Sequence, residues 1–230
     1  MIFMKIVAIG AHPDDIEIGI AGMTAQWTSD GIPVMYVDLT RAELSSNGDV
    51  ATRAREAAEA DEVLGVRRVN LGFPDRGLAV TDAHVEALVR LIRTDRPTHV
   101  LYPYGVDRHP DHGACARLVE EALFNAGIRK YLPDVPAYRP NTVYQYMINA
   151  LETPDVCVDI SETIETKLRA LSAYASQFMP VDGVATPLTD EYVERVRARE
   201  RHFGSLIGAD YAEGLMTVKP YVVHKAGDLA

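Results

Sequence analysis

The feature that most constrains the fold is a regular alternation of apolar runs with helix-like segments. The apolar runs are KIVAIG (5–10), PVMYVDLT (33–40), RVNLGF (68–73), THVLYPY (98–104) and TVYQYMIN (142–149). Helical periodicity follows the first four of them, at 17–30, 50–65, 80–95 and 111–126. Strands alternating with helices of this length form βαβ units, so the sequence predicts an α/β fold with a mostly parallel, Rossmann-like sheet and helices on both faces.

The C-terminal third is less regular. Residues 156–161 (VCVDIS) predict a short strand capped by Ser161, and helices are expected near 162–176 and 189–205. Proline-containing joints at 133–140 and 179–187 predict surface loops. Because 230 residues fit one α/β domain and no linker interrupts them, we expect a single domain over 1–230.

Composition excludes several classes of protein. A net charge of −10, with 23 basic residues scattered among 33 acidic ones, argues against nucleic acid but leaves a small anionic substrate open. No run approaches the roughly 20 apolar residues of a membrane span, and the N-terminus has no cleavable signal, so we expect a cytoplasmic protein. Cys115 and Cys157 offer neither a disulfide framework nor a thiolate zinc site, so any metal must bind nitrogen and oxygen.

Polar clusters follow four of the expected strands: GAHPDD, TRAELSSNG, PDRG and GVDRHPDHG. In a parallel sheet the carboxyl ends of the strands lie at one edge, where ligands bind. These clusters should therefore converge on a single site.

His12, Asp15 and His112 provide two imidazoles and a carboxylate, the kind of three-ligand set that leaves a catalytic Zn²⁺ open to water. Asp14, next to a ligand but pointing the other way, could take the proton of that water. Taken alone, HPDD could equally be a turn with a helix N-cap instead of part of a metal site. Its occurrence together with HPDH after the fourth strand favours the metal site.

His109 and His112 are three residues apart, so both would share one face if Pro110 opens a helix. His109 could then stand off the metal and, if protonated, donate to a developing oxyanion. Asp111 could orient one imidazole from behind. The remaining histidines have no comparable setting and are assigned no chemistry: His84, His99, His202 and His224.

Arg108 adjoins His109 and is well placed to hold a substrate carboxylate in a two-pronged contact. Arg53, judged from its context alone, more often pairs with Glu56 on a solvated helix. Asp75 and Glu43 could accept hydrogen bonds from sugar hydroxyls, although lone residues of this kind more often cap turns.

AHPDDIEIG, TRAELSSNG, NLGFPDRGL and DRHPDHG together resemble the LmbE-like, or PIG-L, family of zinc-dependent N-acetylglucosamine deacetylases. The flanking sequence, including YMINALETPDVCVDIS and LSAYASQF, is similar to that of the bacillithiol-biosynthesis branch, whose members deacetylate N-acetyl-glucosaminyl-malate. The resemblance implies catalytic loops within 10–115, with 140–230 completing the fold and the pocket. It implies His12, Asp15 and His112 as zinc ligands, Asp14 as general base and His109 as stabiliser of the tetrahedral intermediate.

The same resemblance implies Arg53 and Arg108 as partners of the malate carboxylates. In related mycothiol-pathway deacetylases a tyrosine stands where this chain has Asp107, and Tyr192 is a candidate substitute. The expected protein is thus a zinc amidohydrolase, and family resemblance favours a homo-oligomer. Either Asp14 or His109 could protonate the leaving amine.

Alternatives concern the substrate, the metal and the class of protein. The substrate could instead be N-acetylglucosamine, a chito-oligosaccharide or a thiol conjugate. His and Asp ligands also suit Fe²⁺, Co²⁺ or Mn²⁺. The rival class is a non-catalytic module that binds a sugar or a nucleotide. The absence of GxGxxG after the first strand argues against nucleotide binding.

Overall fold

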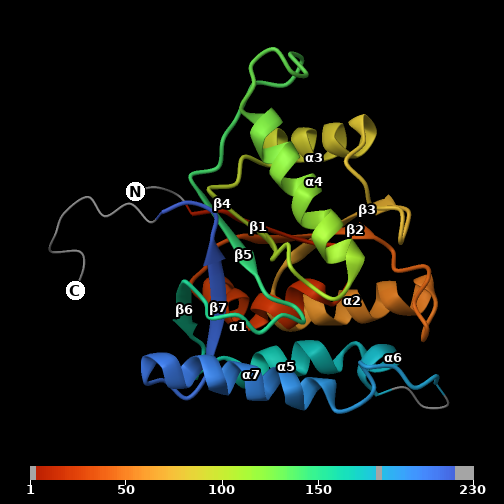
Figure 1. Cartoon of the computed structure of the whole chain (residues 1–230), viewed down its shortest axis with the longest axis vertical. Coiled ribbons are helices and arrows are strands. Elements are labelled where there is room, and N and C mark those ends of the chain that lie inside the picture. Colours follow the sequence, from red (N-terminus) through yellow and green to blue (C-terminus); the bar gives the residue numbers. More distant parts are fainter. Residues whose placement is uncertain (1–3, 180–182, 221–230) are drawn as a thin grey trace, which may run out of the picture.

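Seven strands form one sheet in the computed structural model, which describes residues 4–179 and 183–220 (Figure 1). The strand order is β3-β2-β1-β4-β5-β7-β6. Strands β1 to β5 are parallel, whereas β7 runs antiparallel to both β5 and β6. The elements are β1 (Ile6–Gly10), α1 (Asp15–Ser29), β2 (Val34–Thr40), α2 (Val50–Leu64), β3 (Arg67–Phe73), α3 (Asp82–Asp95), β4 (His99–Pro103), α4 (Pro110–Ala126), β5 (Thr142–Tyr146), β6 (Val156–Asp159), α5 (Ile164–Ser172), α6 (Ala175–Phe178), α7 (Tyr192–Ile207) and β7 (Ala212–Thr217). The predicted α/β class with a mostly parallel sheet is confirmed.

Helices cover both faces of the sheet. Helices α3 and α4 lie on one face and α1 and α2 on the other, with α5 packed against α1 and α2 and α7 packed against α5, β6 and β7 (Figure 1). Strand β1 is buried throughout because it sits between these layers: Ile6 and Ala8 belong to one core, and Val7 and Ile9 to the other. In the described part of the chain, no helix combines the length and the apolar character needed to cross a membrane.

The C-terminal elements differ from those expected. Strand β7 was missed because AEGLMT lacks an alternating pattern, and it inserts between β5 and β6. The helix expected over 162–176 is interrupted at Tyr174, which leaves helical geometry (φ −83°, ψ 55°) and donates its hydroxyl to buried Glu17 at 2.7 Å. Ser161, expected to cap the strand, donates its hydroxyl to Asp159 at the end of β6 and accepts from the Tyr211 backbone N–H at 3.1 Å, and the helix that follows has Thr163 as its N-cap.

Helix α1 is kinked at Ile20 (φ −143°, ψ 20°), which breaks its internal hydrogen bonds. The Glu213 carboxylate of β7 accepts from the freed N–H groups of Gly22 and Met23 at 2.8 and 2.7 Å. On the other side of the kink, the Lys167 ammonium donates to the Ile18 carbonyl at 2.9 Å. A buried ion pair between Lys167 and Glu213 (2.5 Å) joins the two contacts, so tertiary contacts supply the partners that the kinked helix lacks.

Arg93 is buried under the end of α4. Its guanidinium donates to six main-chain carbonyl oxygens, those of Asn125, Ala126, Ile128, Tyr131, Leu132 and Val135, at 2.6–3.1 Å. Because the carboxyl end of a helix carries partial negative charge, these carbonyl oxygens stabilise the cation there.

Replacing Arg93 with Met should therefore lower the free energy of unfolding by about 3 kcal/mol or more, since several buried carbonyls lose their donors. The urea midpoint at constant m-value measures this. Arg90→Met is the matched control, because Arg90 lies on the same helix and makes only exposed ion pairs with Glu86 and Asp134. Equal stability of the two variants would contradict the role given to Arg93.

Candidate active site

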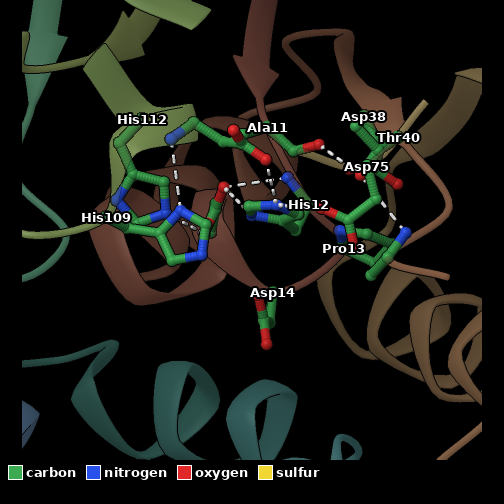
Figure 2. A network of polar contacts seen from close by, with 12 residues as sticks. Ala11, His12, Pro13, Asp14, Asp38, Thr40, Asp75, His109 and His112 are labelled. Carbon is green, nitrogen blue, oxygen red and sulfur yellow. Dashed lines mark hydrogen bonds and ion pairs between the residues drawn. The ribbon is translucent and has the colours of Figure 1, made fainter. Parts of the chain in front are cut away.

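The two histidine motifs meet because β1 and β4 are neighbours in the sheet. The strand order reverses direction between them, so the loops that follow them open side by side, at the switch point where α/β sheets bind ligands. Figure 2 shows His12 from the first loop beside the imidazoles of His109 and His112 from the second. The sheet thus joins residues about a hundred positions apart.

The turn after β1 is tight and strained. Asp14 has φ 107° and ψ −29°, a conformation that residues other than glycine rarely adopt. The Asp15 carboxylate accepts from the backbone N–H of His12 at 2.9 Å, which closes the turn. The turn requires glycine at position 10, because a Cβ there would lie only 2.9 Å from the Ile16 side chain. The turn consequently directs the two adjacent aspartates to different partners.

Asp15 contacts both histidines of the expected ligand set. Its carboxylate oxygens lie 3.1 Å from His112 Nε2 and 3.4 Å from His12 Nδ1. Nitrogens of His12, His109 and His112 also lie within 4.8 Å of one another, so distance alone admits either Asp15 or His109 as the third ligand. The structure therefore brings together every residue of the predicted metal site.

The charges of this cluster suit a divalent cation. Burial opposes ionisation of Asp15, but the His112 and His12 imidazoles hold its pKa well below the usual range. Burial likewise disfavours charge on His112, yet Asp15 and Asp107 raise its pKa to about 9. Carboxylates thus surround the imidazoles closely enough to favour positive charge there. The donor set of nitrogen and oxygen, without thiolate, fits Zn²⁺ and its first-row neighbours.

Asp14 points away from the three imidazoles (Figure 2). Its carboxylate accepts from the Arg53 guanidinium at 2.9 Å. Burial, and then the charge of Asp15, raise the pKa of Asp14 to about 6 although the Arg53 charge opposes them. A carboxylate with a pKa brought towards neutrality is a suitable proton acceptor.

His109 is the N-cap of α4, which begins at Pro110 as expected. Its Nδ1 accepts from the Asp111 backbone N–H at 3.3 Å, so the neutral ring carries its proton on Nε2. Burial and the neighbouring imidazoles lower the pKa of His109. The Nε2–H of the neutral ring is then available as a hydrogen-bond donor, so donation does not depend on the protonated form considered from the sequence.

Asp107 is a further site residue whose role the sequence did not reveal. Its carboxylate lies 2.9 Å from His112 Nδ1 and accepts from Asn149 Nδ2 at 3.0 Å. Burial opposes its ionisation, but His112 and the amide donors outweigh burial and lower the pKa of Asp107 to about 2. Asp107 therefore lies behind His112, where its carboxylate is placed to orient the ring. Its position in the loop after β4, five residues before His112, was the available signal.

Asp107→Asn should weaken metal binding about 10- to 100-fold, because the carboxylate fixes the orientation and basicity of the His112 ring. Competition with a chelator of known affinity measures this. Asp82→Asn, at the exposed first turn of α3, is the control and should bind metal normally. Identical affinities of the two variants would show that Asp107 does not act through His112.

Two other predicted residues, Asp75 and Asp111, flank His12, and a third, Glu43, lies behind Asp75. The Nε2 of His12 lies 3.3 Å from Asp75 and 3.4 Å from Asp111, which is also held by Arg76 at 2.8 Å. The hydrogen bond to His12 lowers the pKa of Asp75 to about 2. Glu43 accepts from the Asp75 backbone N–H at 2.8 Å and does not line the cavity. The structure thus gives Glu43 a turn-capping contact, and its sugar contact stays a prediction.

The two arginines lie in different environments. Arg53 is 2% exposed, and its guanidinium is bound to Asp14 and the Pro13 carbonyl. Arg108 is exposed, and within the described residues no hydrogen bond or ion pair engages it. Arg108 is accordingly the more accessible of the two to a substrate anion. The malate contact implied for Arg53 stays a prediction: Asp14 takes its Nη2, whereas Nε and Nη1 are buried and have no hydrogen-bond partner among the described residues.

Tyr192 lies outside the wall of the metal cavity. Its hydroxyl donates to Asn149 Oδ1 at 3.0 Å, and burial raises its pKa. Through Asn149 it is connected to Asp107 rather than to the imidazoles. A direct role at the oxyanion stays a prediction.

A cavity of about 250 Å³ opens over this cluster. The loops after β1, β2, β3 and β4 all contribute to its wall, as the parallel sheet requires. The C-terminal part of the chain closes it with Gln177, Thr186, Pro187 and Leu188.

Comparisons with known proteins agree with this architecture. Residues 7–123 match the family model PIG-L, described as GlcNAc-PI de-N-acetylase, and include both histidine motifs. A diacetylchitobiose deacetylase of Thermococcus kodakarensis is 31% identical over 233 residues, 96% of this chain and 85% of the relative. A probable N-acetyl-alpha-D-glucosaminyl L-malate deacetylase 2 of Bacillus subtilis is 30% identical over 188 residues, 75% of this chain and 82% of the relative. The conserved protein TT1542 of Thermus thermophilus has a solved structure that superposes with a TM-score of 0.88 at 35% identity, covering 96% of this chain and 97% of that one.

Proposed function

Because the chain belongs to the PIG-L family of GlcNAc-PI de-N-acetylases, we propose that it removes the acetyl group from an N-acetylglucosamine unit of a small molecule. The observation that carries this proposal is the position of Asp14, a buried carboxylate at the wall of the same cavity as the three imidazoles. Amide hydrolysis needs a proton acceptor for water, a donor for the oxyanion and an acid for the leaving amine. The cavity contains a candidate for each.

We assign a metal, most simply Zn²⁺, to His12, Asp15 and His112. When bound, it would supply a Lewis acid that polarises the acetamide carbonyl and acidifies a water molecule. Asp15 is preferred to His109 as the third ligand because its carboxylate contacts both other ligands and stays ionised. His109 is then left for the substrate.

Asp14 takes the proton of the attacking water. Arg53 and the strained backbone of Asp14 hold its carboxylate in place. The Nε2–H of His109 donates to the oxygen that becomes negative as the carbonyl is attacked. Asp14 can return its proton to the leaving amine, which makes one residue serve both steps.

For the substrate itself, we propose N-acetyl-glucosaminyl-malate. The exposed Arg108 at the cavity wall supports an anionic group attached to the sugar, since guanidinium and carboxylate form two-pronged contacts. Diacetylchitobiose is the second candidate, because the relative that acts on it matches nearly the whole chain. A non-catalytic binding module would have no use for a buried base beside a metal site.

The test is amine release by the metal-loaded protein from N-acetyl-glucosaminyl-malate, diacetylchitobiose and N-acetylglucosamine, with a chelated sample as control. Metal-dependent release from at least one is expected, and fastest release from the malate conjugate supports the finer proposal. A preference for diacetylchitobiose would replace it. No release from any of them, with Zn²⁺, Fe²⁺, Co²⁺ or Mn²⁺, would overturn the proposed function. Assembly as a homo-oligomer stays a prediction for light scattering to test.

A further inference from the structure

A second cavity of about 400 Å³ adjoins the metal cavity. The two share Arg108 and Pro187 in their walls, so Arg108 stands at the boundary between them. The second cavity lies between the segment that follows β5 and the first turns of α7, and it includes Asn149, Leu151 and Tyr192. A molecule whose acetamide occupies the metal cavity could extend its other end past Arg108 into this space.

The charge of the second cavity is unusual for a protein of net charge −10. Three arginines line it, Arg108, Arg195 and Arg199, and no acidic residue among those that the structure describes does so. Such a local excess of cations inside an acidic protein favours an anionic ligand.

Only two of the three arginines can take a ligand. Arg199 is committed to the fold, because it donates to the carbonyls of Ile18 and Ile148 and pairs with buried Glu200. Arg195 pairs with Asp190, but both side chains are exposed (56% and 72%), and an exposed pair of this kind contributes little and is easily exchanged. Arg108 has no such partner among the described residues.

We infer that this cavity binds a carboxylate-bearing group joined to the amino sugar, with Arg195 of α7 as the residue that selects for it and Arg108 at the junction. The inference rests on the proposed function, since it places the acetamide at the metal site. Tyr192 and Asn149 also line this cavity. Specificity for the attached group thus comes from the C-terminal part of the chain, and the chemistry from the loops that follow β1 and β4.

Arg195→Gln is the test variant and Arg201→Gln the control, because Arg201 is an exposed residue of the same helix that lines neither cavity. For Arg195→Gln we expect kcat/KM to fall about ten-fold more for N-acetyl-glucosaminyl-malate than for diacetylchitobiose, mainly through KM. Arg201→Gln should behave as wild type with both substrates. Equal losses on the two substrates would overturn the inference and leave the deacetylase function standing.

Binding of glucosaminyl-malate, the deacetylated product, gives a readout that needs no turnover. Calorimetric titration should show about ten-fold weaker binding to Arg195→Gln than to wild type or Arg201→Gln. Wild-type binding that depends on Arg195 in a protein without deacetylase activity would support the cavity and reject the proposed function. Unchanged binding to Arg195→Gln would reject the cavity as the anion site.

Discussion

Asp14→Asn should lower kcat about 10²- to 10⁴-fold while leaving bound metal unchanged. Asparagine keeps the size of the side chain and tolerates a left-handed backbone, so the strained turn at φ 107° should persist. What it loses is the ability to accept and return a proton. Initial rates on the best substrate of the panel, together with metal content by elemental analysis, measure the two effects separately.

Asp30→Asn is the matched control, since Asp30 is the exposed residue at the other end of α1. It should retain the wild-type rate. An Asp14→Asn protein that is metal-loaded and turns over near the wild-type rate would eliminate Asp14 as the base. Loss of metal together with activity would instead make Asp14 part of the metal site.

Lys167→Met should lower the free energy of unfolding by about 3–5 kcal/mol, because it leaves buried Glu213 without its cation and Glu200 with Arg199 alone. Lys167 is fully buried and lies 2.5 Å from Glu213 and 2.8 Å from Glu200. The same change removes a donor from the Ile18 carbonyl at the kink of α1. Urea unfolding measures the loss, and Arg169→Met, an exposed change on the same helix, should have little effect.

The deficit of Lys167→Met should shrink as the pH falls through the raised pKa of Glu213. Burial already raises the pKa of Glu213 in the wild type, with Lys167 opposing the rise, so removing Lys167 raises that pKa further. A carboxyl group with a raised pKa in the folded state binds its proton more tightly there than in the unfolded chain, so acid favours folding and the benefit is lost as the pH rises. A deficit independent of pH would contradict this account.

The metal-site residues were accessible from the sequence because their signal is local and repeated. HPDD and HPDH each follow an apolar run, and parallel topology alone brings the ends of such runs to one edge. The environment of Arg53 was not accessible in the same way. From the sequence it was a solvated helix residue paired with Glu56 or a contact for malate. In the structure Glu56 lies 3.9 Å away, but Arg53 is buried and its guanidinium holds Asp14.

The C-terminal third shows the opposite case. Strand β7 has no alternating pattern because its neighbours on both sides, β5 and β6, and the layer of α7 define its environment. Lys167, Glu200 and Glu213 look like ordinary surface charges in the sequence. Only their convergence on the kink of α1 explains their burial.

The order of residues along the chain was enough to establish the α/β class, the edge of the sheet at which the site lies, and the cluster of His12, Asp14, Asp15, His109 and His112. Periodicity and short motifs encode these features within a few residues. Tertiary packing established that Asp107 supports His112, that Asp75 and Asp111 flank His12, and that Arg108 stands between two cavities. Those contacts join segments distant in the chain, and their geometry is fixed by packing, which no local pattern records.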